Sequence, residues 1–386
     1  MSWKRLFSRA LAAAPDRLHF AAHSHHLWPD AAYDGQLEAV DWAMRLADDK
    51  WEPILGDLWS EAQRHVAEEL ALPDPSTVVF APNTHEFLMR LLSAAERRPV
   101  RVLSSDGEFH SFRRQIARSV EAGDVVLEAV PTEPFVSFAE RFLDAAGRTD
   151  ADIVFVSQRF FGTGRRFDRY REVAAAAPAD AIVVIDGYHG FMAEETDLSE
   201  IAGRAFYTAG GYKYAMSGEG VCFLHCPPGV AERPVFTGWY AEFEDLSLPP
   251  GAVGYAPDAR RFLGSTFDPS GLFRFAHVRR ALGEAGATTA AVSAHTRTLQ
   301  SQFLDAVAAG RAGALADAEL LNPPTDRDAA RFLAFRHPHA ARWKAALRTA
   351  DVVTDVRGDV LRIGFGAYQD ERDVERLLDR AGEAIN

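Results

Sequence analysis

The chain has few cysteines, no long apolar run and no excess of positive charge. Its 386 residues include only two cysteines, Cys222 and Cys226, which do not indicate a disulfide framework and fit a reducing compartment. The net charge of −13 argues against a general nucleic-acid surface, because phosphate binding needs clustered Lys and Arg. The apolar stretch near the N-terminus is short and interrupted by charges such as Arg9, and no long uncharged segment follows. We therefore expect a cytoplasmic protein that neither spans a membrane nor is exported.

The composition of the chain indicates a folded globular protein. Hydrophobic residues make up 47% of the chain and charged residues 25%, which is typical of globular proteins rather than disordered ones. The length is sufficient for two domains. We found no internal repeat and no low-complexity run beyond Ala-rich helices.

From about residue 77 to residue 226, β-branched runs alternate with helical stretches. This alternation predicts a large, mainly parallel sheet of the seven-stranded type with helices on both faces, hence an α/β fold. Ligands bind at the carboxyl ends of such strands, and Asn83, Phe109, Ser157 and Asp186 all follow predicted strand ends. The strands predicted here cover residues 77–81, 101–105, 152–157, 181–186 and 220–226.

The pattern changes after residue 228. An aromatic, Pro- and Gly-rich stretch (236–271) leads into helices (273–309) and then into a smaller α+β unit that ends in an amphipathic helix. We expect three parts: an N-terminal segment that packs on the small domain and the active-site entrance, a large ligand-binding domain, and a small C-terminal domain. Their predicted ranges are 1–50, 51–270 and 271–386.

Asp186 and Lys213 have the spacing that a pyridoxal 5'-phosphate (PLP) site requires. Asp186 ends a strand in VVIDGYHGF, and Lys213 follows in the Gly-rich stretch YTAGGYKYAMSGEG. Such an aspartate keeps the pyridine nitrogen of PLP protonated, and such a lysine holds its aldehyde as a Schiff base. Asn83 and Thr84, at a helix start, could bind the phosphate, or one of them could simply cap the helix.

Several motifs in the same order resemble the class V aminotransferase family of fold-type I PLP enzymes, and within it the kynureninases. They are GGYKY around Lys213, FTGWY (236–240), YAPDARRFLGST (255–266) and VRGDVLRIGFGAYQDERDVERLL (356–378). The resemblance extends from about Phe20 to the C-terminus. It implies a fold-type I PLP-dependent transferase fold with a large domain and a smaller α+β C-terminal domain.

The resemblance also implies roles for the residues that would surround the cofactor. Lys213 would form the Schiff base and Asp186 would pair with the pyridine nitrogen. The remaining cofactor contacts would be Asn83 and Thr84 at the phosphate, Phe109 stacked on the ring, His189 beside it, and Ser157 at its strand end. Phe109 favours the kynureninase side of the family, because other class V enzymes usually have His at this position.

Further roles concern catalysis, the second subunit and the substrate. Tyr212 would reach the phosphate and act as proton donor, so Lys213 and Tyr212 are the predicted catalytic residues. Trp239 and Thr266 match residues that a second subunit contributes to the phosphate site, which implies a homodimer. Arg362 matches the arginine that binds the substrate α-carboxylate through its planar fork.

The substrate pocket departs from the family pattern. His23, Ser24 and His26 lie in AAHSHHLWPD, where kynureninases have Asn-Ser-Leu-Gly, and we predict that they contact the substrate. The three close histidines, His23, His25 and His26, have no Cys or carboxylate partners nearby and do not favour zinc, so we expect no metal. YAMSGEG and TGWYAEF also differ from the family, and GTGRRFD carries extra arginines, Arg165 and Arg166, which are either solvated charges or contacts for an acidic substrate.

The leading prediction is kynureninase-like hydrolysis of the Cβ–Cγ bond of an amino acid, giving alanine and an aromatic acid. Transamination, elimination and epimerisation on another amino acid are the alternatives on the same scaffold. Desulfuration is disfavoured, because Cys222 and Cys226 lie in or beside a strand rather than on a mobile loop. A non-catalytic PLP-binding scaffold or sensor is the alternative from another class, and the intact set of Lys213, Asp186, Thr84 and Arg362 argues against it.

Overall fold

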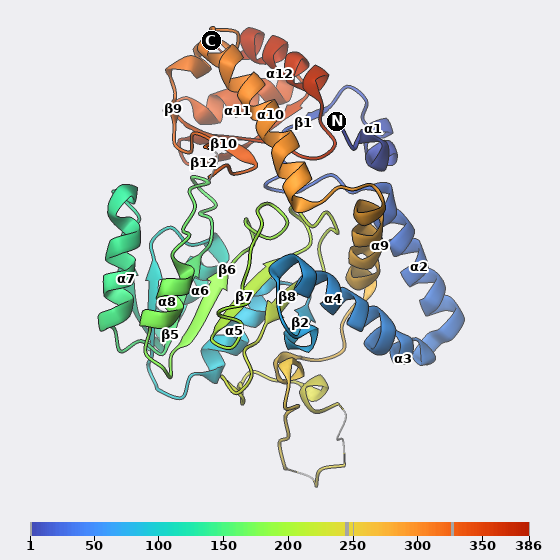
Figure 1. The fold of residues 1–386 in the computed structure, drawn as a ribbon, viewed down its shortest axis with the longest axis vertical. Coiled ribbons are helices and arrows are strands. Elements are labelled where there is room, and N and C mark those ends of the chain that lie inside the picture. Colours follow the sequence, from blue (N-terminus) through green and yellow to red (C-terminus); the bar gives the residue numbers. More distant parts are fainter. Residues whose placement is uncertain (1, 244–246, 250, 326–327, 386) are drawn as a thin grey trace.

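The fold is that of a computed structural model, which describes residues 2–243, 247–249, 251–325 and 328–385. A seven-stranded sheet with the strand order β2-β8-β7-β6-β5-β3-β4 forms its centre (Figure 1). β8 runs antiparallel to both neighbours and the other adjacent pairs are parallel, which confirms the predicted mainly parallel sheet. The strands are β2 (Val78–Ala81), β3 (Val100–Ser105), β4 (Val125–Val130), β5 (Ile153–Ser157), β6 (Ile182–Asp186), β7 (Ala205–Gly210) and β8 (Cys222–His225).

Two of these strands were not predicted. β4 is an edge strand, and its four central residues are exposed, so it does not have the continuous apolar pattern of a buried strand. β7 runs directly into the Gly-rich turn that carries Lys213, and its sequence AFYTAG was interpreted as part of that turn. Both strands owe their place to pairing with neighbours distant in sequence.

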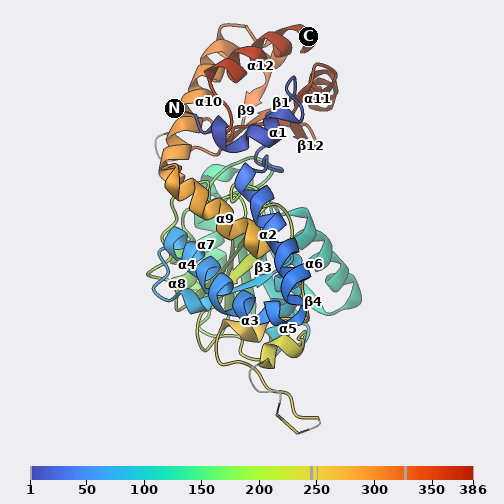
Figure 2. The same cartoon turned by 90° about the vertical axis from the view of Figure 1, so that its right-hand side faces the viewer.

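Helices lie on both faces of the sheet, as Figures 1 and 2 show from two directions. α2 packs along α9, and the two backbones come close at Gly35, where an added Cβ would lie 2.7 Å from the carbonyl oxygen of Phe273. The helices of the large domain are α2 (Asp30–Leu46), α4 (Trp59–Leu70), α5 (Thr84–Ala94), α6 (His110–Ala122), α7 (Phe138–Arg148), α8 (Tyr170–Ala176) and α9 (Ser270–Glu284).

The small domain is an α+β unit, as predicted, with a four-stranded sheet of order β12-β13-β10-β9. A short strand near the N-terminus, β1 (Leu18–His19), pairs in parallel with β11 (Val352–Val353) and ties the N-terminal segment to this domain. The other elements are β9 (Glu319–Leu320), β10 (Phe332–Arg336), β12 (Asp355–Arg357), β13 (Val360–Gly364), α10 (Thr289–Ala308), α11 (Ala340–Thr349) and α12 (Glu371–Ala384).

Two large hydrophobic clusters form the core of the described chain. The larger cluster includes α9 and reaches Val292 in α10, whereas the second begins along α10 at Leu299. α9 stays with the large domain because it buries its apolar residues against α2 and α4. Along the chain, the change from the first cluster to the second thus falls inside α10, and the predicted domain ranges stay a prediction. Of the N-terminal segment, Leu18 and Phe20 pack on the small domain, while α2 packs on the large one.

Within the part of the chain that the structure describes, no helix is both long and apolar enough to cross a membrane.

Candidate active site

The carboxyl ends of β5 and β6 and the turn after β7 meet around Lys213. The side chains there enclose a cavity, and a second cavity adjoins it, sharing Thr84, Phe109 and Asp186. Each has a volume of about 30 Å³. The residues that line the first cavity are Thr84, Phe109, Ser157, Arg159, Phe161, Asp186, Tyr188, His189, Tyr212 and Lys213.

The Lys213 amine is buried among aromatic rings. Its Nζ lies 4.3 Å from the ring centre of Tyr188, 5.4 Å from that of Phe109 and 5.6 Å from that of Tyr212. Among the described residues, none forms a hydrogen bond or ion pair with this amine. Burial lowers the pKa of Lys213 to about 7, although the charge of Asp186 acts in the opposite direction. A large fraction of the amine is therefore uncharged and nucleophilic at neutral pH.

Asp186 places a carboxyl in the same cavity. Its Oδ1 accepts a hydrogen bond from the backbone N–H of Tyr188 at 2.9 Å. Burial raises the pKa of Asp186, and Lys213 partly offsets this shift. Ser157 on β5 is the register partner of Asp186 on β6, so the two side chains are neighbours at one edge of the sheet. This arrangement suits a cationic N–H group bound between them.

His189 and the start of α5 contribute further polar groups. His189 is buried, and burial lowers its pKa well below the usual value, so its ring is neutral. Its Nδ1 is among the buried side-chain atoms of the described chain that have no hydrogen-bond partner. Thr84 lines the cavity at the first turn of α5, whereas exposed Asn83 uses its Oδ1 to accept from Glu86 N at 3.0 Å. In this structure, Asn83 thus caps α5, which is one of the two roles that the sequence allowed for it.

Tyr212 lies between two other rings. His25 stacks on it at 4.9 Å between ring centres, and Tyr188 lies 4.8 Å away on a tilted plane. Burial raises the pKa of Tyr212 to about 12, so its hydroxyl keeps its proton and is able to donate it. Tyr188 was not predicted as a site residue, although it stands inside the DGYHG motif between Asp186 and His189.

Arg362 is buried and already paired. Its Nη2 donates to Asp355, the residue directly opposite on β12, and its Nη1 donates to the carbonyl oxygen of Phe161. Within the described residues its Nε has no hydrogen-bond partner. The fork is thus held in place from two sides, and its unpaired Nε–H remains for a ligand. Asp355 was also missed in the sequence, where it is one of many carboxylates near strand ends.

The three predicted substrate residues near the N-terminus have different surroundings. His23 is fully buried, stacks on Phe332 at 4.6 Å between ring centres, and has its Nε2 3.8 Å from an oxygen of Asp355. His26 packs against Tyr368, its Nδ1 lies 2.8 Å from the carbonyl oxygen of Leu27, and burial lowers its pKa to about 3. Ser24 is only partly buried. His23 is thus the one that lies beside the Arg362 pair.

Trp239 and Thr266 do not line the cavities around Lys213. Both are exposed, Trp239 at 41%, and both belong to an arm whose described residues are 235–243, 247–249 and 251–266, seen at the bottom of Figure 1. The structure of a single chain therefore brings most of the predicted cofactor residues together around one cavity, but not Asn83, Trp239 or Thr266. The residues brought together are Thr84, Phe109, Ser157, Asp186, His189, Tyr212 and Lys213.

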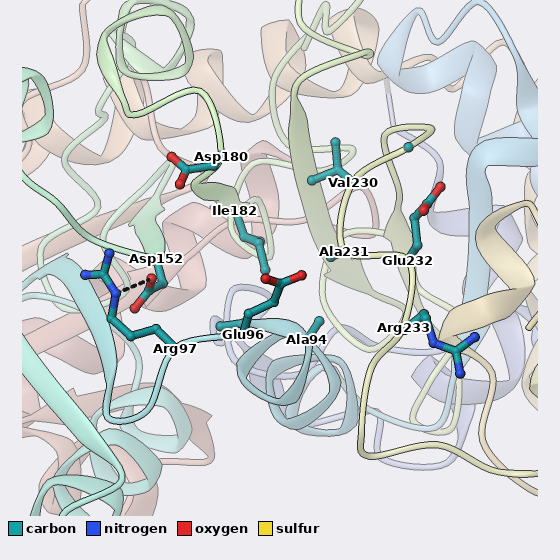
Figure 3. Close-up of a pocket in the computed structure, with 12 residues that line it drawn as sticks. Ala94, Glu96, Arg97, Asp152, Asp180, Ile182, Val230, Ala231, Glu232 and Arg233 are labelled. Atoms are coloured by element: carbon teal, nitrogen blue, oxygen red, sulfur yellow. Dashed lines mark ion pairs between the residues drawn. The ribbon is translucent and has the colours of Figure 1, made fainter. Parts of the chain in front are cut away.

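A wider cavity, about 620 Å³, lies elsewhere (Figure 3). It borders Asp152 and Ile182, at the starts of β5 and β6, and Arg97 forms an ion pair with Asp152 there at 3.4 Å. This is the opposite edge of the sheet from Ser157 and Asp186. This cavity is not the candidate active site, because Lys213, Asp186 and His189 do not line it.

The groups around Lys213 fit PLP by their chemistry. An unpartnered buried amine suits an aldehyde, a buried carboxyl suits a pyridinium N–H, and the unpaired His189 Nδ1 can serve a further polar group. The first turn of α5 offers backbone N–H groups to a phosphate. No group of His, Cys, Asp and Glu able to hold a metal ion occurs in the described ranges.

Comparisons with known proteins agree with this chemistry. The family described as kynureninase C-terminal domain matches residues 292–380. The kynureninase of Deinococcus radiodurans is 27% identical over 362 residues, which are 86% of this chain and 83% of that protein. The isopenicillin N epimerase of Streptomyces clavuligerus is 27% identical over 328 residues, 79% of each chain.

Solved structures match the fold over its full length. The cystine C–S lyase C-DES superposes with a TM-score of 0.81 at 16% identity, covering 97% of this chain and 99% of that one. Its variant with glycine covalently linked to the PLP cofactor superposes with a TM-score of 0.80, also at 16% identity and over the whole of both chains. At this identity the match concerns the fold alone. The two sequence relatives and the matched C-terminal domain support a kynureninase-like member of the class V family of PLP-dependent enzymes.

Proposed function

We propose that this enzyme cleaves the Cβ–Cγ bond of kynurenine or a related amino acid by hydrolysis, giving alanine and an aromatic acid. The observation that carries the proposal is the Lys213 amine, which is buried among rings without a polar partner, in one cavity with Asp186. The 27% identity to a kynureninase over most of both chains supports the choice of reaction.

In this proposal each residue of the site has a defined task. Bound PLP would supply an electron sink that weakens the bonds at the substrate Cα. Asp186 would hold the pyridine nitrogen protonated, and Thr84, with the start of α5, would hold the phosphate. Lys213 Nζ would bind the aldehyde carbon and later accept the proton from the substrate Cα.

The remaining tasks concern the substrate. Arg362 would bind the α-carboxylate through its unpaired edge while Asp355 keeps the guanidinium in place. Tyr212, whose hydroxyl stays protonated, would donate a proton as the Cβ–Cγ bond breaks. Phe109 and Phe161, whose ring centres lie 5.3 Å apart, would exclude water from one side of the cavity.

Epimerisation of an amino acid is the second candidate. The match to isopenicillin N epimerase covers 79% of each chain. Reversing the configuration at Cα needs a second acid besides Lys213, and the Tyr188 and Tyr212 rings both adjoin its amine. Desulfuration by a thiol nucleophile is less compatible, because both cysteines are buried in or beside β8.

We also propose that the enzyme is a homodimer in which each subunit completes its partner's site. α2 carries an exposed apolar stripe of Tyr33, Leu37, Val40 and Met44 at helical spacing, and Met44 is 83% exposed. The arm of residues 235–266 exposes Val235, Phe236, Trp239, Phe243, Leu248 and Val253. Surfaces of this kind usually pack against another protein.

One experiment separates the candidate reactions. Purified enzyme is loaded with PLP, its visible absorbance is recorded, and kynurenine is added while anthranilate fluorescence and alanine are measured. We expect anthranilate and alanine to form together, and we expect Lys213→Ala to lose the visible band and turnover. Lys344→Ala, which removes an exposed lysine, is the matched control and should keep both.

The other outcomes are equally informative. A normal visible band without anthranilate would refute the hydrolytic reaction while leaving the cofactor site standing. Exchange of the Cα proton of an amino acid with D₂O and a change in its configuration would then favour the epimerase. No visible band in the PLP-loaded wild type would refute the cofactor site itself.

A further inference from the structure

Glu108 is a fully buried carboxyl that none of the roles above uses. It immediately precedes Phe109 in the loop between β3 and α6. Its Oε1 accepts hydrogen bonds from Ser105 Oγ at 2.5 Å and from Ser157 N at 3.2 Å, and its Oε2 accepts one from Ser157 Oγ. A buried carboxyl without hydrogen-bond partners would be strongly destabilising. The three donors satisfy Glu108 and allow the fold to keep it buried.

These bonds determine what Ser157 offers to the cavity. A serine hydroxyl has a single proton, and in Ser157 that proton is directed at Glu108. The oxygen that lines the cavity therefore presents lone pairs only. Asp186, its register partner, likewise presents a carboxyl. The edge of the cavity formed by β5 and β6 thus accepts hydrogen bonds and suits a ligand with N–H or O–H donors.

The same bonds fix the position of Phe109. Glu108 is anchored to Ser105 on β3 and to Ser157 on β5, so the backbone that leads into Phe109 is held between two strands. Ser105 Oγ also accepts from Gly107 N at 3.1 Å, which tightens the loop. Phe109 then begins α6 with its ring at the cavity wall.

Glu108 also adds charge behind the cavity. The groups that face it are Ser105 on β3, Ser157 on β5 and Asp186 on β6. Burial raises the pKa of Glu108 to about 7, the two serines oppose this shift, and Asp186 adds to it. Two neighbouring carboxyls are costly to bury unless a cation comes to lie near them.

We propose that Glu108 is a positioning residue of the cofactor site. It orients the Ser157 hydroxyl so that its oxygen accepts a hydrogen bond from the ring of bound PLP, and its carboxylate stabilises the positive charge of that ring together with Asp186. The inference rests on the proposed cofactor site and extends it by a residue that does not itself touch the ligand.

The test compares Glu108→Gln with the wild type in two measurements. In the variant, the amide nitrogen donates to Ser157 Oγ, which turns the serine proton towards the cavity and removes one negative charge. We expect the dissociation constant for PLP, measured by quenching of protein fluorescence, to rise about tenfold. We also expect the pH midpoint of the visible band to fall, because a lost carboxylate destabilises a nearby cation.

Asp106→Asn is the matched control. Asp106 lies in the same loop, is exposed, and anchors it through Thr132, whose N–H and hydroxyl donate to its Oδ1 at 2.8 Å. This variant should keep the wild-type affinity and midpoint. If Asp106→Asn shifts both measurements as far as Glu108→Gln does, loop stability explains the effect and the proposal is wrong.

Ser157→Ala keeps the test decisive if Glu108→Gln does not fold. It should weaken PLP binding on its own. Where Glu108→Gln does fold, the effects of the two substitutions on PLP affinity should be less than additive in the double variant, because Glu108 acts in part through Ser157. Wild-type affinity in Ser157→Ala, or full additivity, would overturn the proposal. A missing visible band in the wild type would instead refute the cofactor site on which the inference rests.

Discussion

Burial sets the charge of the side chains around Lys213. The amine is surrounded by rings rather than by carboxylates, so its charged form is disfavoured, and its pKa falls to about 7. His189 and His23 are neutral for the same reason, with pKa values well below normal. The site therefore contains an uncharged nucleophile beside two neutral imidazoles at physiological pH.

The depressed pKa of Lys213 predicts the pH dependence of PLP uptake. Only the unprotonated amine attacks the aldehyde, so the rate at which the visible band forms should rise with pH and level off above about pH 7 to 8, not near the usual lysine pKa of about 10.4. Stopped-flow absorbance between about pH 5.5 and 9.5 measures this rate. A rate that still rises tenfold per pH unit at pH 9 would contradict the low pKa.

The pair of Arg362 and Asp355 predicts a large loss of stability when one partner is removed. In Asp355→Asn the buried guanidinium would lose its carboxylate, and we expect the free energy of unfolding in urea to fall by about 3 kcal/mol. Asp359→Asn, an exposed aspartate in the turn between the same two strands, should change it little. Equal stability of the two variants would show that Arg362 is not held by Asp355.

At the scale of elements, the N-terminal segment around Phe20 and His23 packs directly against β13. Gly364 N donates to the carbonyl oxygen of Phe20 at 2.7 Å, and a Cβ on Gly364 would lie 2.2 Å from Nδ1 of His23. The absence of a side chain at Gly364 thus lets His23 lie next to the strand that carries Arg362. This contact joins elements from the two ends of the chain.

The fit predicts that Gly364→Ala destabilises the enzyme and that His23→Ala relieves part of the loss. The single substitution forces the ring of His23 out of its place, at a cost of about 1 to 3 kcal/mol. Adding His23→Ala removes the clash, so the melting temperature of the double variant should exceed that of Gly364→Ala. Gly203→Ala, where nothing lies within 4 Å of the added Cβ, is the control.

At the scale of the whole molecule, the exposed arm of residues 235–266 and the apolar stripe of α2 favour a dimer with shared sites. Mixing Lys213→Ala chains with Trp239→Ala chains tests this. If Trp239 serves the partner's site, the hybrid has one complete site, because the Lys213→Ala chain supplies Trp239 to the other chain. We expect each parent to be inactive or weak and the mixture to regain activity, measured after the chains have exchanged.

Two results would contradict the shared site. If the mixture is no more active than the average of the parents although hybrids form, Trp239 acts on its own chain or not at all. If sedimentation shows a monomer, and Leu37→Glu on α2 changes nothing in its mass or its affinity for PLP, the stripe is not a subunit contact.

The sequence by itself determined the fold class and indicated which residues of the large domain gather around Lys213. β-branched runs with short loops place Ser157 and Asp186 at strand ends, and the GGYKY turn carries Lys213 beyond them, so local signals sufficed. The small α+β domain and its closing helix also follow from periodicity, and a capping box of Asp370 and Asp373 starts that helix.

Only the tertiary structure decided which distant residues meet. Glu108, in the loop after β3, accepts a hydrogen bond from Ser157 on β5. Arg362 donates to Asp355 on the paired strand β12, and His23 lies in the space beside Gly364. The change of hydrophobic cluster inside α10 and the edge strand β4 likewise depend on packing against partners far away in the chain. Such contacts arise from pairing and burial between elements, for which no local sequence pattern gives a signal.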